Sequence, residues 1–164
     1  MRAGDKLPEL TVPVTRTLIV SGAIASRDYQ DVHHDAVAAQ EKGSPDIFMN
    51  ILTTNGLVGR YVTDHFGSAA VLRKVAIRLG APNYPGDTMV LTGSIERVDG
   101  DTATVKVLGA NGIGKHVTGT VMVTVPGAGP SASPAEAVAE AGTEGAADAA
   151  AGPGRDGTPT GGAA

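Results

Sequence analysis

One short segment of the chain places an aspartate five residues before a histidine. Asp28 and His33 lie between Ala25 and Asp35, where polar side chains are flanked by an apolar run and an Ala-rich run. A carboxylate and an imidazole at this spacing can hold one water molecule between a base and an acid. Ordering so many polar groups is costly unless they have a function. We therefore interpret Asp28 and His33 as candidate catalytic residues.

The other polar residues of this segment have simpler interpretations. An alternative interpretation of Asp28 is that it merely caps a helix, without a catalytic role. Asp31 is interpreted as structural or turn-forming. His34 and Asp35 are typical of a solvated helix start. Carboxylates and imidazoles also suit divalent cations. However, adjacent histidines such as His33 and His34 rarely point the same way, and a helical pair four residues apart is missing, so we expect no metal site.

The composition changes sharply near the C-terminal end. The chain has 164 residues, and from Gly127 onward it consists almost entirely of Ala, Gly, Pro, Ser, Thr and acidic residues. Such a segment cannot bury enough apolar surface to offset the loss of chain entropy. We predict one folded domain, residues 1–126, followed by a disordered tail, residues 127–164.

Charge and residue usage exclude several functions. The tail accounts for the whole net charge of −4, so the predicted domain is neutral and has no basic stripe for nucleic acid. The absence of cysteine excludes disulfides, thiolate metal sites and a cysteine nucleophile. The N-terminus has no apolar signal-peptide core, and no apolar run approaches the roughly 20 residues that span a bilayer. We expect a cytoplasmic protein with neither nucleic-acid nor membrane partners.

The hydrophobic pattern predicts one strand, two short helices and one long helix in the first part of the chain. Pro13 places the strand at an edge or bulge, and the first helical turn would present Asp28 at its end. Ser44-Pro45 predicts the start of the long helix. This helix is apolar nearly all round and is therefore predicted to be buried. The four elements are Thr11–Thr17, Ile19–Ser26, Ala36–Glu41 and Asp46–Phe66, the last ending at Gly67.

The remainder of the domain has only strand patterns, in which apolar and polar residues alternate. Asp99-Gly100 and Asn111-Gly112 predict hairpin turns. Gly109–His116 matches part of a phosphate-binding loop, but strands flank it on both sides, whereas such a loop leads into a helix. We therefore predict an α+β fold with an antiparallel meander around one long helix. Its strands are Val71–Leu79, Met89–Glu96, Ala103–Val107 and Val117–Val125.

Both the residue pair and the order of elements resemble the MaoC-like hydratases, which have the hotdog fold. Their signature is roughly Gly-Asp-x-Asn-Pro-x-His, and Asp28 and His33 fall on its two catalytic positions. Gly86-Asp87, before a strand, matches a second feature of the family. The resemblance implies a single hotdog fold, an antiparallel sheet wrapped around one buried helix. The chain departs from the family pattern at Arg27, Gln30, Asp31 and Met49-Asn50.

These departures resemble a subgroup, the small catalytic subunits of heteromeric MaoC-like enoyl-CoA hydratases in actinobacterial cholesterol side-chain degradation. Asp46-Ile47-Phe48, Asn50-Ile51-Leu52 and the segment 60–64 are similar to that subgroup. The resemblance implies a larger MaoC-like partner that lacks the catalytic pair, in a heterodimer or heterotetramer. It also implies a steroid enoyl-CoA substrate, whose coenzyme A is the only cofactor-like group. Asp28 would accept the proton of water, and His33 would orient that water or donate to C2.

The family resemblance also implies substrate contacts. Backbone N–H groups near Met49 and Asn50 would contact the thioester oxygen, since a helix N-terminus favours negative charge. Arg73, Lys74 and Arg78 are interpreted mainly as a solvated strand face, and alternatively as contacts to the coenzyme A phosphates.

Three other functions are alternatives at this stage. The chain could be a self-sufficient (R)-specific enoyl-CoA hydratase for fatty acyl chains, or a non-catalytic acyl-binding or scaffold subunit. A thioesterase is disfavoured, because hotdog thioesterases usually carry the working carboxylate on the long helix. Here Asp46 and Asp64 lie only at the ends of the predicted helix.

Overall fold

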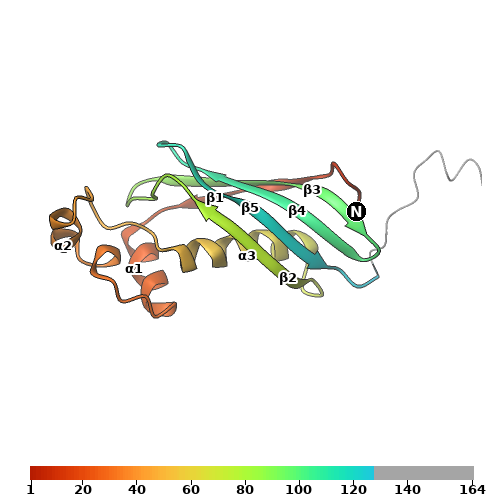
Figure 1. Cartoon of the computed structure of the whole chain (residues 1–164), viewed down its shortest axis with the longest axis horizontal. Coiled ribbons are helices and arrows are strands. Elements are labelled where there is room, and N and C mark those ends of the chain that lie inside the picture. Colours follow the sequence, from red (N-terminus) through yellow and green to blue (C-terminus); the bar gives the residue numbers. More distant parts are fainter. Residues whose placement is uncertain (128–164) are drawn as a thin grey trace, which may run out of the picture. The chain divides into compact units, whose positions relative to one another are not determined.

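The computed structural model describes residues 1–127, and the predicted tail beyond Gly127 lies outside the described residues. A five-stranded antiparallel sheet has α3 along one face (Figure 1), which confirms the predicted arrangement of a sheet around one long helix. Within residues 1–127, no helix is long and apolar enough to cross a membrane. The elements are β1 Lys6–Pro13, α1 Arg16–Ala25, the 3₁₀ turn η1 Asp31–His33, α2 Ala36–Glu41, α3 Ile51–Phe66, β2 Val71–Leu79, β3 Thr88–Asp99, β4 Thr102–Ala110 and β5 Lys115–Thr124.

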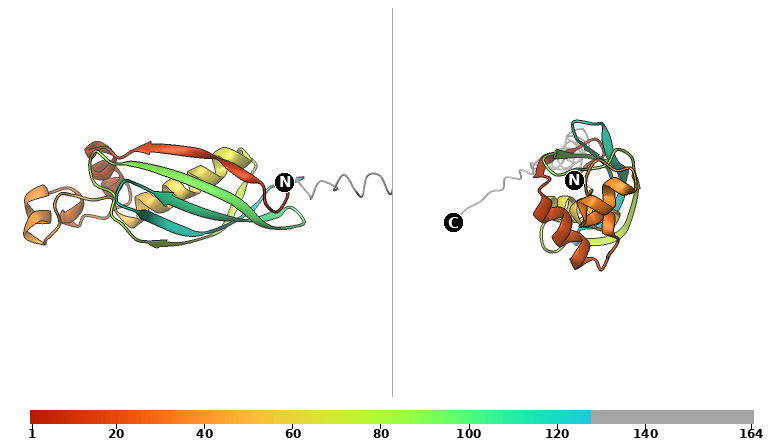
Figure 2. Two further views of the ribbon diagram at one scale, coloured as in Figure 1. Left: turned by 90° about the horizontal axis from the view of Figure 1, so that it is seen from above. Right: turned by 90° about the vertical axis from the view of Figure 1, so that its left-hand side faces the viewer.

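The strand order, β1-β3-β4-β5-β2, differs from the predicted meander. Only β3, β4 and β5 form a meander, and their two hairpin turns lie where they were predicted. β2 instead pairs with the far side of β5, so β1 and β2 are the two edge strands. Between β1 and β2, α1 and α2 lie at one end of the sheet and α3 runs along one face of it (Figure 2), which lets the chain return at the opposite edge.

The core lies between α3 and the sheet. Val58, Tyr61 and Val62 form the buried face of α3. Residues two apart on each central strand point toward the helix, because successive side chains of a strand alternate between its faces. Fully buried strand residues larger than alanine include Met89, Leu91, Val105, Val121 and Val123. Burial of each such side chain contributes about 1.5–3 kcal/mol.

The first strand begins earlier than the sequence pattern predicted. β1 covers Lys6–Pro13 rather than 11–17. The strand ends before Thr15 because Thr15 is the N-cap of α1, and its hydroxyl accepts a hydrogen bond from the Leu18 N–H at 3.0 Å. Pro13 is the last residue of an edge strand, where its missing N–H costs nothing. The predicted edge position is therefore confirmed.

The long helix begins at Ile51 and not at Asp46, so the prediction of Ser44-Pro45 as its start is wrong. The preceding residues make tertiary pairings that a helix would break: the Met49 N–H donates to the Asn83 carbonyl at 3.0 Å. Asn50 is the actual N-cap, and its side-chain oxygen accepts the Thr53 N–H at 3.0 Å.

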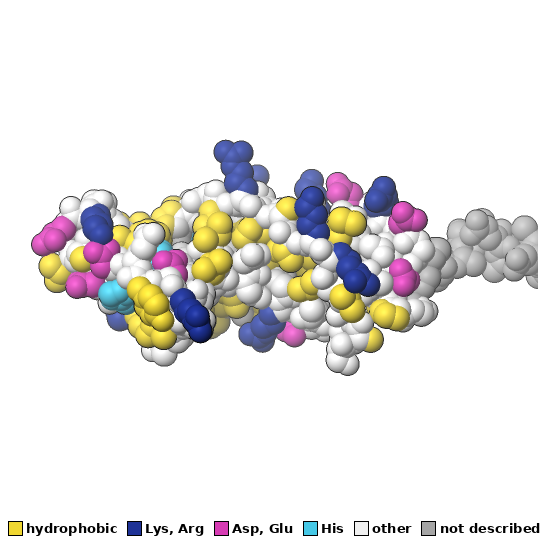
Figure 3. Space-filling model, turned by 60° about the horizontal axis from the view of Figure 1, so that its bottom comes forward, with side chains coloured by type: hydrophobic (Ala, Val, Ile, Leu, Met, Phe, Trp, Pro, Cys, Tyr) yellow, Lys and Arg dark blue, Asp and Glu magenta, His cyan; other side chains and the backbone are white. Residues whose placement is uncertain are grey.

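Nor is α3 buried all round. Ile51 and Leu52 are each 47% exposed, and the face of the molecule that carries α1 and α3 shows hydrophobic side chains at its surface (Figure 3). One face of α3 therefore packs on the sheet, while part of the helix presents apolar residues to the outside.

α1 packs closely on α3 at Gly22. A Cβ atom built on Gly22 would lie 2.2 Å from Thr53 Oγ1 and 2.9 Å from Thr53 Cγ2. These distances are shorter than any van der Waals contact, so only glycine permits this approach of the two helices.

We predict that Gly22→Ala lowers the free energy of unfolding by about 1–3 kcal/mol, the cost of forcing an extra methyl group into a packed contact. Gly56→Ala is the matched control, since a Cβ there meets nothing within 4 Å. It should raise the free energy of unfolding by about 0.5–1 kcal/mol, because alanine favours a helix. Urea denaturation of both variants checks this, and equal stability of the two would contradict the close contact.

Candidate active site

The end of α1 fixes the backbone of Asp28. The Asp28 N–H donates to the Ala23 carbonyl at 2.9 Å, and the Arg27 N–H donates to the Ile24 carbonyl at 3.0 Å. These two bonds form a Schellman motif, which requires a left-handed residue after the helix. Arg27 takes that conformation, with φ of 58°. The glycine of the MaoC-like signature therefore occupies a position that needs a positive φ. In this chain an arginine, Arg27, adopts that conformation.

His33 is held by the 3₁₀ turn η1 and by a backbone carbonyl. Its side chain is 8% exposed, and Nδ1 lies 2.7 Å from the Phe48 carbonyl oxygen. A carbonyl only accepts, so Nδ1 carries the hydrogen and donates it. The Phe48 ring packs edge-on against the imidazole, with centroids 5.0 Å apart. The other nitrogen, Nε2, then has a lone pair in the neutral ring.

That free nitrogen faces the carboxylate of Asp28. His33 Nε2 and Asp28 Oδ2 are 3.4 Å apart, and both residues line one pocket of about 320 Å³. The predicted pair therefore comes together at the wall of one pocket. Other walls of this pocket are residues 48–51 and 79–82, together with Gln30 and His116.

The side chain of Asn50 completes the surroundings of the carboxylate. Its Nδ2 donates to Asp28 Oδ2 at 3.0 Å and to Ser26 Oγ at 2.9 Å. From the sequence, only the backbone of Asn50 was predicted to contact the substrate. An asparagine before an amphipathic helix is a strong N-cap signal, and this signal would have located the start of α3.

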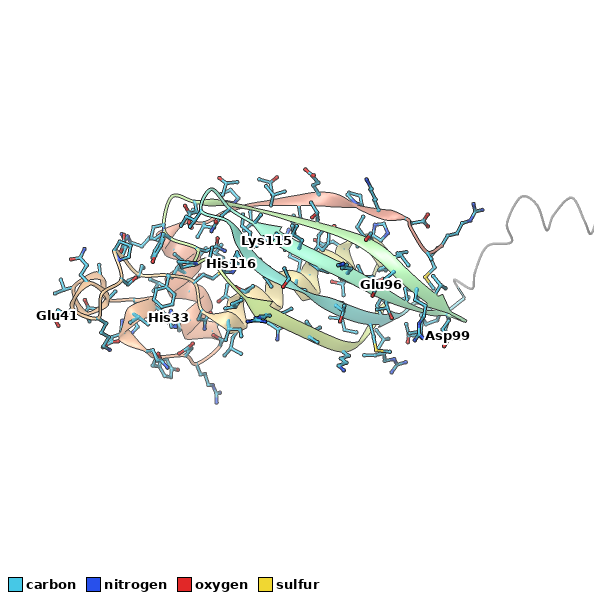
Figure 4. The ribbon with its side chains drawn as sticks, turned by 45° about the horizontal axis from the view of Figure 1, so that its top comes forward. His33, Glu41, Glu96, Asp99, Lys115 and His116 are labelled. Atoms are coloured by element: carbon cyan, nitrogen blue, oxygen red, sulfur yellow. The ribbon has the colours of Figure 1, made fainter. Side chains whose placement is uncertain are left out.

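A second buried histidine lies beside the same pocket. His116 is 1% exposed, its Nδ1 donates to the Ala81 carbonyl at 2.7 Å, and its Nε2 accepts the Thr54 hydroxyl at 2.8 Å. Burial lowers the pKa of His116, which favours the neutral ring. In Figure 4, His33 and His116 lie at the same end of the sheet. In the sequence, the position of His116 after a partial phosphate-loop pattern gives no sign of this role.

The start of α3 has backbone N–H groups without an acceptor at residues that line the pocket. Met49 is not one of them, since its N–H is donated to Asn83. Among the described residues, the N–H groups of Asn50 and Ile51 have no acceptor, and both residues line the pocket. Of the two predicted donors to the thioester oxygen, only the Asn50 N–H is available. The Ile51 N–H is a further candidate beside it.

The three predicted coenzyme A contacts all lie on β2, and none of them lines the pocket. Arg73 Nε donates to Thr124 Oγ1 at 3.0 Å, and neither Lys74 nor Arg78 lines the pocket. All three side chains are exposed on β2.

The remaining polar residues of the segment stabilise the local fold. Asp31 pairs with Lys42, and the ammonium group holds the pKa of this carboxyl below its usual range. Asp35 is the N-cap of α2 and accepts the N–H groups of Val37 and Ala38, as predicted for a helix start. Across residues 1–127, no group of three or more His, Cys, Asp or Glu side chains is placed to hold a metal ion.

Comparison with known proteins identifies the family. Residues 3–116 match the MaoC-like domain. The chain is 49% identical over 122 residues to the 3-oxo-4,17-pregnadiene-20-carboxyl-CoA hydratase beta subunit of Mycobacterium tuberculosis, covering 74% of this chain and 95% of that protein.

Solved structures agree with this assignment. A chain of the ChsH1–ChsH2 complex from Mycobacterium tuberculosis has a TM-score of 0.74 at 49% identity, covering 75% of this chain and 97% of that one. The (R)-hydratase from A. caviae involved in PHA biosynthesis has a TM-score of 0.70 at 18% identity, covering 77% and 98%, and this likeness concerns the fold alone. The chain belongs to the MaoC-like domain family.

Proposed function

We propose that this chain is the catalytic subunit of an enoyl-CoA hydratase that adds water across the 2,3 double bond of a steroid side-chain thioester. The observation that carries the proposal is the Asp28–His33 pair, with 3.4 Å between Oδ2 and Nε2 at the wall of a pocket. The steroid substrate is inferred from the 49% identical beta subunit, whose length the chain covers to 95%.

Hydration needs a base for water, an acid for C2 and donors for the thioester oxygen. Asp28 is the base, and His33 Nε2 orients the water or passes a proton to C2. The oxygen of water bonds to C3, its proton passes to the pair, and the pair delivers a proton to C2. Both residues therefore end the turnover in their starting protonation states.

Negative charge develops on the thioester oxygen as the water adds. The N–H groups of Asn50 and Ile51 are unpaired donors at the N-terminus of α3, and the dipole of a 16-residue helix favours an anion there. Donors aimed at such an oxygen are often a large part of catalysis. No group beyond the coenzyme A of the substrate is needed for this chemistry.

A larger MaoC-like subunit is the proposed partner. Apolar residues are exposed both at the start of α3 and on the edge strand β2, where Val71 and Leu72 are 42% and 37% exposed. An edge strand with unpaired backbone groups and apolar side chains is a surface for another chain. The likeness to a chain of the ChsH1–ChsH2 complex supports a heteromer.

Two further points belong to the proposal. In the alternative to a solvated strand face, some of Arg73, Lys74 and Arg78 would meet the coenzyme A phosphates, which the long pantetheine arm separates from the thioester. A cytoplasmic location follows from the use of a coenzyme A thioester as substrate.

Asp28→Asn and His33→Ala should each lower the turnover of a steroid enoyl-CoA by about 10²–10⁴-fold, because each removes a proton-transfer group. The assay follows the loss of enoyl-thioester absorbance by the co-expressed complex. Asp31→Asn is the control, since it removes a neighbouring carboxylate that pairs with Lys42 and does not line the pocket. Unchanged turnover in intact Asp28→Asn complexes would move the active site to the partner and leave this chain a scaffold.

Substrate preference and assembly test the rest of the proposal. We expect the chain to form a stable complex with the larger subunit in size-exclusion chromatography and to prefer the steroid thioester over octenoyl-CoA. If the chain alone is a homodimer that is fully active on octenoyl-CoA, it is instead a self-sufficient (R)-specific hydratase.

A further inference from the structure

We propose that the side chain of Asn50 is a positioning residue that holds Asp28 Oδ2 by a hydrogen bond and leaves Asp28 Oδ1 as the oxygen that takes the proton of water. The inference rests on the proposed function and adds a side chain to it that the family signature does not contain.

The orientation of the Asn50 amide is fixed by the helix. Its Oδ1 accepts the Thr53 N–H at 3.0 Å, and a backbone N–H can only donate. Nδ2 must therefore be the end that faces Asp28 and Ser26. A flipped amide would lose the helix cap and would set its carbonyl oxygen against a carboxylate.

Both hydrogens of Nδ2 have their acceptors. Ser26 Oγ donates its single hydrogen toward the Gly22 carbonyl at 2.7 Å, so it accepts from Asn50 Nδ2 at 2.9 Å. The second hydrogen goes to Asp28 Oδ2 at 3.0 Å. Because Asn50 is only 2% exposed, water does not compete for these donors. The amide is thus a rigid link between the end of α1 and the start of α3.

This link makes the two oxygens of Asp28 unequal. Oδ2 faces both Asn50 Nδ2 and His33 Nε2, whereas Oδ1 has no partner within the described part of the chain. A hydrogen bond to a carboxylate favours its charged form. Asn50 therefore stabilises the carboxylate of Asp28 through Oδ2, while Oδ1 is left to accept the proton of water.

Two substitutions separate this role from helix capping. Asp and Ser are N-caps about as good as Asn, so Asn50→Asp and Asn50→Ser should both retain the start of α3. Asn50→Asp replaces a donor to Asp28 by a second carboxylate, and like charges disfavour ionisation. Asn50→Ser removes the donor without adding a charge.

We expect the acidic limb of kcat/KM to move to higher pH in Asn50→Asp, by about one unit or more. At pH values below this limb, kcat/KM should fall about tenfold per pH unit. The change should be larger in kcat than in KM. Asn50→Ser should move the limb less in the same direction. The other titratable residues that line this pocket are His33 and His116, and neither is substituted in these variants.

Gln40→Glu is the matched control, because it makes the same amide-to-carboxylate change on the exposed surface of α2, outside the pocket. It should leave the profile unchanged. Folding is checked by circular dichroism and by retention of the complex, and if Asn50→Asp fails to fold, Asn50→Ser alone decides.

The inference is overturned if the folded Asn50 variants keep the wild-type profile, or if they lose kcat with the acidic limb unmoved, which would indicate a purely structural role. Asp28→Asn in the same assay distinguishes the two levels of the proposal. An inactive Asp28→Asn beside an unchanged Asn50→Asp refutes only the role of Asn50, whereas an active Asp28→Asn refutes the proposed base itself.

Discussion

The hydrogen bonds of a single amide, that of Asn50, join the parts of the chain on which the candidate site depends. Its oxygen caps the start of α3 by accepting the Thr53 N–H. Its nitrogen donates to Ser26 and Asp28 at the end of α1. The carboxylate is separated from Asn50 by more than twenty residues of sequence, yet it is placed by the same group that starts the central helix. Any shift of α1 against α3 therefore moves the base relative to the rest of the pocket.

Two close contacts hold that relation in place. Gly22 lets α1 approach Thr53 more closely than any residue with a Cβ would. At the other end of the segment 44–50, Arg16 and Asp46 form a two-point ion pair with its shorter contact at 2.6 Å. The pair is partly exposed, so it contributes little to stability on its own. Its geometry nevertheless ties the first residue of α1 to the segment that leads into α3.

The sequence predicted those features that depend on local pattern. The pair Asp28 and His33, the short α2 helix and the two hairpin turns all follow from spacing or turn chemistry within a few residues. The start of α3 could not be obtained this way, because Ser44-Pro45 is a good local start signal. The tertiary bond from Met49 to Asn83 excludes a helix there. Similarly, alternation revealed the strands but not that β2 pairs with the far side of β5, since pairing across the sheet leaves no local mark.

The arrangement also divides the donors at the start of α3 between two negative charges. A helix N-terminus supplies several unpaired N–H groups. Here the Thr53 N–H donates to the side-chain oxygen of Asn50. The amide nitrogen of the same residue serves Asp28, while the backbone N–H groups of Asn50 and Ile51 stay unpaired beside the pocket. A glycine at this position would leave the backbone donors but provide nothing for the carboxylate. An asparagine supports the charge on the base through its side chain and leaves the backbone for the charge that develops on the substrate.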